Sequence, residues 1–147
     1  ALHNQINTIT SSMTNPEDII MLLDGDDWLV NNNTLFHLYN DYYQMGAEFT
    51  YGSCWSIADN IPLVAQDYPS YIKKSKNYRD YKFNWGIPYT HLRTFKKSLF
   101  DKLENLEGFK NESDEYYKAG GDNAMFYELI EQANPENIYA IKEIIYV

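Results

Sequence analysis

The chain has 147 residues and a formal net charge of −9, with 44% hydrophobic and 22% charged residues, a composition typical of one globular domain. The acidic surface repels phosphate backbones, which argues against a nucleic-acid-binding protein, and no apolar run is long enough to span a membrane. Cys54 is the only cysteine, so no intrachain disulfide can form and we expect a cytoplasmic protein.

The apolar spacing predicts that helices and strands alternate along the first third of the chain. Helical spacing predicts a helix over residues 1–13. The wholly apolar run of residues 19–23, bounded by turn signals, predicts a strand covered on both faces. A second helical pattern begins at Leu35 and can end at Gly46, and residues 48–55 resemble a second strand.

The pattern is weaker from residue 58 to residue 120 and becomes clear again in the last helix. The expected elements are a short helix over residues 71–81, a strand over 90–95, helices over 97–103 and 122–132, and strand-like runs over 138–141 and 144–147. Because strand and helix patterns alternate, we expect an α/β fold.

Three carboxylates lie within four residues directly after the first predicted strand, at Asp24, Asp26 and Asp27. Their mutual repulsion is tolerable where a divalent cation or a bound donor group offsets it, and carboxylates suit Mg²⁺ and Mn²⁺. Ligands of open α/β sheets bind beyond the carboxyl ends of the strands, and Gly25 permits a sharp turn there. The segment predicts a metal-and-phosphate site, with a surface turn as the alternative.

A second acidic motif, Gly120-Gly121-Asp122-Asn123, opens the last predicted helix. A carboxylate at Asp122 can accept the proton of an attacking hydroxyl and so act as a general base. The flexible glycines would let an acceptor approach. The alternative is an ordinary loop followed by a helix N-cap.

The segment from Trp85 to Phe95 is dense in groups that recognise ligands. His91 and Arg93 alternate with Leu92, so both are expected on one side of a strand. His91 can bind a metal or a phosphate oxygen, and Arg93 can pair with a phosphate. The alternative is a structural histidine beside an arginine held in a salt bridge.

These motifs, in this order, resemble those of family 2 glycosyltransferases with the GT-A fold. Residues 24–28, Asp-Gly-Asp-Asp-Trp, resemble the DXD segment, and residues 1–6 resemble the helix before it. Residues 90–95 resemble the segment leading to the acceptor side, and residues 121–131 resemble the acidic "ED" motif with its helix. The resemblance covers most of the chain and implies a mixed, mostly parallel sheet flanked by helices.

The resemblance also implies an activity: transfer of a sugar from a nucleotide-diphosphate sugar to a hydroxyl of a glycan or protein, with inversion and with Mn²⁺ or Mg²⁺. Asp24 and Asp26 would be the metal ligands, and Asp122 would deprotonate the acceptor. The residues implied as neighbours of donor or acceptor are Asp24, Asp27, Trp85, His91 and Arg93.

The chain departs from the family pattern in two places. Gly121 stands where the family has Glu. The family's first strands, which hold the nucleoside base, have no counterpart here. We therefore expect residues 1–147 to form a single glycosyltransferase-like domain, incomplete at its N-terminus, that corresponds to the C-terminal two-thirds of a GT-A domain, and we expect the natural protein to continue upstream.

Two other interpretations stay open. A haloacid-dehalogenase-type phosphatase also carries D-x-D after an apolar strand, although Trp28 stands where that family has Thr or Val. A non-catalytic carbohydrate- or partner-binding module of the same fold is the second alternative.

Overall fold

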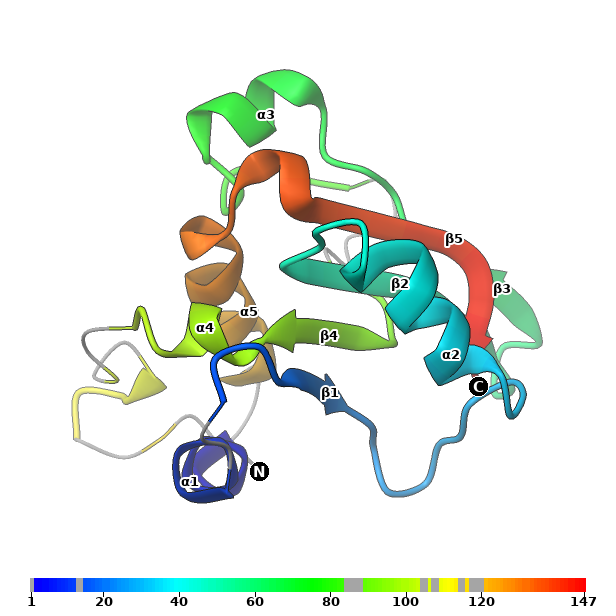
Figure 1. Ribbon diagram of the computed structural model, residues 1–147, viewed down its shortest axis with the longest axis horizontal. Helices are drawn as coiled ribbons and strands as arrows, with labels where there is room; N and C mark the ends of the chain where they lie inside the picture. Colours follow the sequence, from blue (N-terminus) through cyan, green and yellow to red (C-terminus); the bar gives the residue numbers. More distant parts are fainter. Residues whose placement is uncertain are drawn as a thin grey trace.

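The computed structural model describes residues 2–12, 15–83, 89–103, 106, 109–113, 116 and 121–147, the last range without the side chains of residues 121 and 122. The elements in chain order are α1 (Leu2–Ser12), β1 (Ile19–Leu22), α2 (Thr34–Leu38), the π-helix η1 (Tyr39–Tyr43), β2 (Phe49–Ser56), β3 (Ile61–Leu63), α3 (Ser70–Ser75), β4 (Arg93–Lys96), α4 (Lys97–Phe100), α5 (Gly121–Gln132), the 3-10 helix η3 (Pro135–Asn137) and β5 (Ile138–Tyr146). The chain folds as an α/β protein with an open sheet flanked by helices (Figure 1).

The sheet is mixed, with the strand order β1-β4-β2-β3 and with β5 beside β2. Among the described strands only the pairing of β2 with β5 is parallel, whereas β1–β4, β4–β2 and β2–β3 are antiparallel. The expectation of a mostly parallel sheet is therefore wrong. Strands β1 and β2 run in the same direction, as expected. However, β4 lies between them and runs in the opposite direction (Figure 1), so β1 and β2 each pair with β4 in antiparallel fashion.

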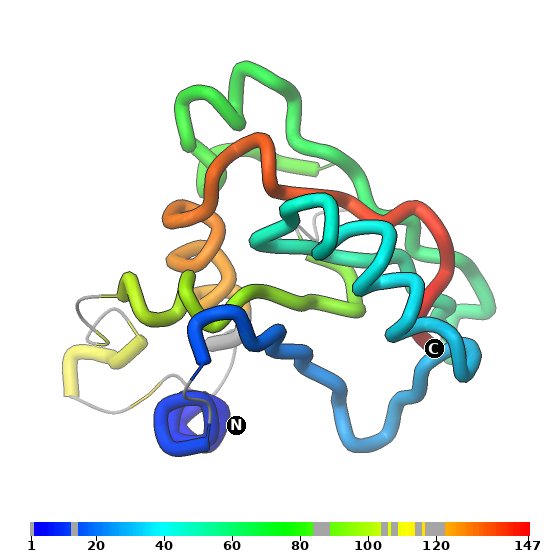
Figure 2. The backbone as a smooth tube through the Cα atoms, in the orientation of Figure 1, coloured from blue at the N-terminus to red at the C-terminus, as the bar shows by residue number. Residues whose placement is uncertain are grey.

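Each face of the sheet has its own core, because side chains alternate across the strands. On one face the fully buried rings of Phe49 and Phe95 pack edge-on against Phe126 of α5. On the other face α2 and η1 pack through Leu38 and Tyr43, in one cluster with Ile141 of β5. Figure 2 traces α2 and η1 in front of the sheet.

Most predicted elements form, with shifted ends. The helices predicted over residues 1–13, 71–81 and 122–132 appear as α1, α3 and α5, and α3 is the shortest relative to its prediction. The first two predicted strands appear as β1 and β2. The expectation that the first strand is covered on both faces holds only at Ile20, because the other residues of β1 are half-buried at the outer side of the described sheet.

The remaining differences concern strands. The strand predicted over residues 90–95 begins only at Arg93, so His91 precedes β4 instead of lying within it. The two runs predicted at the end of the chain join into one strand, β5, whose register against β2 shifts twice between Tyr51 and Cys54. Strand β3 was not predicted, because Pro62 lies at its centre and a central proline argues against a strand.

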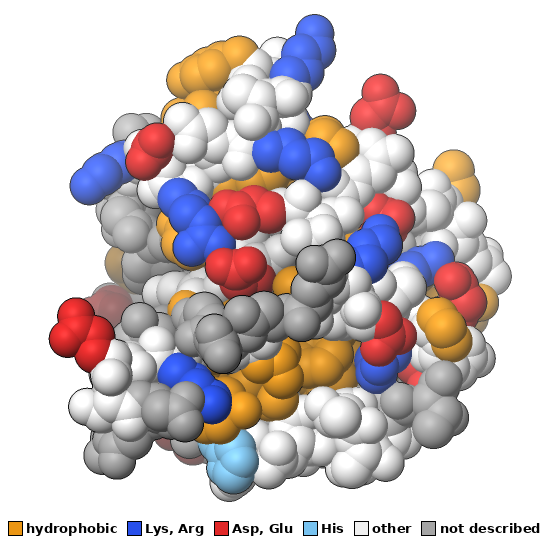
Figure 3. Space-filling model, turned by 90° about the vertical axis from the view of Figure 1, so that its left-hand side faces the viewer, with side chains coloured by type: hydrophobic (Ala, Val, Ile, Leu, Met, Phe, Trp, Pro, Cys, Tyr) orange, Lys and Arg blue, Asp and Glu red, His pale blue; other side chains and the backbone are white. Residues whose placement is uncertain are grey.

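Charged side chains are mixed on the surface, and the helices are short. On the face seen in Figure 3, acidic and basic side chains are interspersed and form no basic patch. Among the ion pairs of the described residues, Arg79 donates to Glu128 at 2.6 Å and to Glu131 at 2.7 Å. Across the part of the chain that the structure describes, the helices lack the length and apolar character needed to cross a membrane.

Candidate functional site

The acidic segment of residues 24–27 follows β1 and is held in place by the end of β5. Its turn closes through the amide of Asp27, which donates to the carbonyl of Asp24 at 3.2 Å. Directly after it, Trp28 and Val147 exchange two backbone hydrogen bonds of 3.0 and 2.9 Å, and Leu29 bridges Tyr146 in antiparallel fashion. The C-terminal strand therefore anchors the acidic loop to the sheet.

The phenol of Tyr146 makes hydrogen bonds to two residues of this loop. Its hydroxyl donates to Oδ2 of Asp27 at 2.5 Å and accepts a longer bond, 3.4 Å, from the amide of Asp24. The side chain is only 3% exposed. Burial raises the pKa of Tyr146 well above its ordinary range, and the adjacent Asp27 raises it further. The phenol therefore stays protonated at neutral pH and keeps donating to the carboxylate.

His91 connects Tyr146 to a buried arginine. The imidazole lies against the phenol ring with centroids 4.8 Å apart and planes 32° apart. Its Nε2 lies 2.6 Å from Nη2 of Arg93, and because a guanidinium only donates, Nε2 accepts and the ring proton lies on Nδ1. The guanidinium of Arg93 also lies over the ring of Phe126, 4.9 Å from its centroid. Contacts thus run from Arg93 through His91 and Tyr146 to Asp27.

A pocket of about 520 Å³ opens beside these residues. Its polar lining includes Asp26, Asp27 and His91. Two indole rings also line it, those of Trp28, 52% exposed, and Trp55, 37% exposed. The other lining residues are Cys54, Ser56, Ile57, Ala58, Leu63, Tyr146 and Val147. The pocket therefore combines carboxylate acceptors with accessible aromatic faces.

Three of the predicted site residues, Asp26, Asp27 and His91, meet at this pocket, and two others stand apart from it. Arg93 is 8% exposed and is not among the lining residues, but its guanidinium contacts His91, which is. Asp24 is exposed in the same loop but is not among the lining residues.

Two further predicted residues lie outside what the structure describes. Trp85 falls outside the described residues. Asp122 lies in the first turn of α5, and its side chain is outside the described part. The role of Asp122 as a general base therefore stays a prediction.

Two exposed carboxylates of the acidic loop are candidate ligands for a metal ion. Among the described residues, no group of three or more His, Cys, Asp or Glu side chains could hold a metal ion. The exposed carboxylates of Asp24 and Asp26 nevertheless match the usual binding of Mg²⁺, which takes one or two carboxylates together with substrate phosphates and waters. A metal ion held by these two carboxylates would need further ligands from outside the described residues.

Sequence reasoning missed Tyr146 and Trp55. Trp55 lies near the carboxyl end of β2, where ligands of α/β sheets gather, so its place in a predicted strand was a usable signal. Tyr146 carried no such signal, because its role depends on β5 meeting a loop 119 residues earlier in the chain.

The chain matches no protein-family model, no curated protein and no solved structure. The resemblance to glycosyltransferases therefore rests on the sequence motifs alone.

Proposed function

We propose that the chain is a glycosyltransferase domain of GT-A type, whose pocket binds a nucleotide-diphosphate sugar with Mn²⁺ or Mg²⁺ and transfers the sugar to a hydroxyl acceptor. The observation that carries this proposal is the meeting of Asp26 and Asp27 with the indoles of Trp28 and Trp55 in one pocket. Carboxylates accept hydrogen bonds from sugar hydroxyls. Indole rings offer broad apolar faces on which the C–H face of a sugar can pack.

The acidic residues divide into two roles in this proposal. Asp26, with Asp24 beside it, holds the cation together with the donor diphosphate. When bound, that cation offsets the negative charge that grows on the leaving nucleotide. Asp27, whose carboxylate is fixed by Tyr146, orients the hydroxyls of the donor sugar. Asp122 takes the proton from the acceptor hydroxyl.

The guanidinium of Arg93 supports the pocket wall from inside the protein. It is buried and hydrogen-bonded to His91, so it helps to hold the imidazole that lines the pocket. Arg93 acts here as a positioning residue for His91, without touching the substrate.

Calorimetry tests the proposal directly. UDP-glucose and UDP-N-acetylglucosamine are titrated into the protein with and without Mn²⁺. We expect binding that depends on Mn²⁺ and is lost in Asp26→Asn, while Asp80→Asn, which changes an exposed acid outside the pocket lining, keeps it. Equal binding in the absence of Mn²⁺, or unchanged binding by Asp26→Asn, would contradict the metal-bridged site.

One observation favours a second candidate, a carbohydrate-binding module without catalysis. The two indoles and the carboxylates that line the pocket can hold a free sugar without a metal, and the described residues contain no cluster of three ligands for an ion. Titration with free glucose and N-acetylglucosamine separates the two cases. Binding of the free sugar that is indifferent to Mn²⁺ supports the module, and binding restricted to nucleotide sugars with Mn²⁺ supports the transferase.

A further inference from the structure

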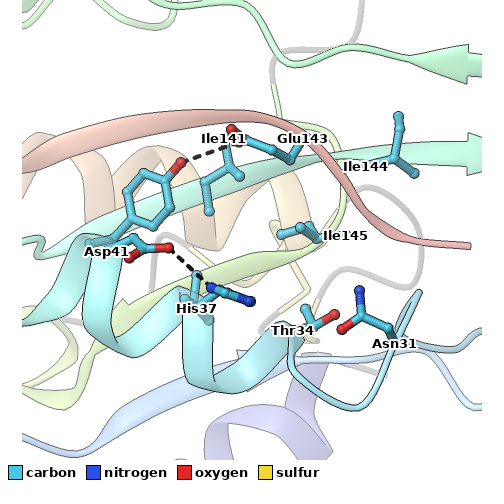
Figure 4. Close-up of a pocket in the computed structure, with 10 residues that line it drawn as sticks. Asn31, Thr34, His37, Asp41, Ile141, Glu143, Ile144 and Ile145 are labelled. Atoms are coloured by element: carbon cyan, nitrogen blue, oxygen red, sulfur yellow. Dashed lines mark hydrogen bonds and ion pairs between the residues drawn. The ribbon is translucent and has the colours of Figure 1, made fainter.

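A second pocket, of about 310 Å³, lies between the helical segment α2–η1 and residues 141–145 of β5 (Figure 4). Its apolar lining comes from Leu38 of α2 and from Ile141, Ile144 and Ile145 of β5. Its polar lining consists of Asn31, Thr34, His37, Asp41, Tyr42 and Glu143. It shares no lining residue with the pocket of the acidic loop.

The charge of this second pocket is negative. Its lining contains two carboxylates, Asp41 and Glu143, and neither lysine nor arginine. Figure 4 shows the two internal contacts: Asp41 pairs with Nδ1 of His37 at 3.4 Å, and Glu143 accepts from the hydroxyl of Tyr42 at 3.4 Å. A carboxylate has about four acceptor sites, so one long contact leaves acceptor capacity on each. An anionic ligand would be repelled here.

The one lysine of β5, Lys142, has other partners. The ammonium group of Lys142 donates to the carbonyl of Ala65 at 2.6 Å and lies 3.9 Å from Asp67. Lys142 is not among the residues that line the pocket, whereas Glu143 is. The pocket therefore lacks a cation that its own strand could have supplied.

Two further features point to a ligand at this place. Thr34 lines the pocket and is only 3% exposed, yet its hydroxyl has no hydrogen-bond partner among the described residues. A buried polar group without a partner destabilises a fold, so its presence in a pocket wall needs a reason. In addition, Asp41 and Tyr42 come from a π-helical turn, closed by the amide of Gln44 on the carbonyl of Tyr39 at 2.9 Å. Such turns are rare and occur frequently at functional sites.

We propose that this pocket is a second binding site and that it takes a small organic cation, a primary amine with a short aliphatic chain. The ammonium group donates to Asp41 and Glu143 at the rim. The aliphatic chain packs on Leu38, Ile141 and Ile145. A metal ion is a poorer match, because no group of three metal-ligating side chains is present in the described part of the chain.

Isoleucine methyl groups make this proposal measurable by NMR, since Ile141, Ile144 and Ile145 all line the pocket. Protein labelled at isoleucine methyl groups is titrated with pentylamine, and with 1-pentanol and pentanoate as neutral and anionic probes of equal length. We expect saturable shifts at these three residues with pentylamine and none with pentanoate. The methyl groups of Ile6 and Ile9, buried in the other core, report that the fold is intact.

Charge removal at the rim provides the decisive comparison. Glu143→Gln changes an exposed residue and should weaken pentylamine binding about fivefold, the effect of losing one exposed charge pair. Glu136→Gln, an exposed acid outside the pocket lining, should leave the Kd unchanged. The proposal is overturned if 1-pentanol binds as tightly as pentylamine, if the three methyl groups show no saturable shift, or if Glu143→Gln and Glu136→Gln give the same Kd as the unaltered protein.

Discussion

Replacing Tyr146 by Phe removes one oxygen atom from the base of the acidic loop and leaves the ring in place. The lost hydroxyl donates to Asp27 at 2.5 Å and accepts from the amide of Asp24 at 3.4 Å. A hydrogen bond to a charged group contributes about 1.5–3 kcal/mol, and removal of the donor leaves the carboxylate to find another. Asp27 is half-buried, so water can reach it, and the 3.4 Å bond is too long to add much. We therefore expect Tyr146→Phe to lower the free energy of unfolding by about 1.5 kcal/mol, the lower end of that range.

Urea unfolding at pH 7 measures this loss, and Tyr139→Phe, on the same strand, is the matched control. The same variant should weaken metal-dependent binding of UDP-glucose about tenfold, because Asp27 loses the contact that orients it and 1.4 kcal/mol corresponds to that factor. If Tyr146→Phe is as stable as the unaltered protein and binds the nucleotide sugar equally well, the phenol does not organise the loop and the account of the site is wrong.

Three other predictions concern the packing around Gly52, the proposed base Asp122 and the buried phenol of Tyr78. Gly52→Ala should destabilise the protein by about 1–3 kcal/mol in urea unfolding, because the added Cβ would lie 2.7 Å from Cδ1 of Ile145 and 2.9 Å from the backbone nitrogen of Leu92. Asp122→Asn should slow sugar transfer at least about 100-fold and leave donor binding intact; normal turnover would exclude Asp122 as the base. Burial raises the pKa of Tyr78 to about 12, so its stabilising contribution is complete below the unfolded pKa of about 10 and is lost as the pH rises toward 12, by about 1.4 kcal/mol per pH unit. Tyr78→Phe should flatten the fall in stability over that window, and an unchanged slope would contradict it.

Strand β5 links the two pockets through neighbouring residues. Ile145 lines the pocket beside α2, and Tyr146 lines the pocket of the acidic loop. One short segment of β5 therefore contributes to both sites. The chemistry of each pocket is thus set partly by the same stretch of backbone, which also pairs with Trp28 at the edge of the acidic loop.

Local chemistry explains what was predictable. Apolar spacing of 3.6 or 2 residues identifies the type of an element and the side that it buries, and this located α1, β1, β2 and α5 within a few residues. The acidic turn after β1 was readable because an apolar run followed at once by Asp24, Gly25 and Asp26 is a local signal. Asp27 and His91, named from the sequence, do line one pocket.

Non-local pairing decided the rest. Spacing carries no information on which strands pair or in which direction, so the insertion of β4 between β1 and β2 was invisible in the sequence. The same holds for the site: Trp55 and Tyr146 reach the acidic loop only because β2 and β5 pair in parallel and end beside it. The sequence alone determined which residues could carry the chemistry, while the tertiary structure decided which of them meet, because strand pairing joins residues whose separation along the chain no local pattern can encode.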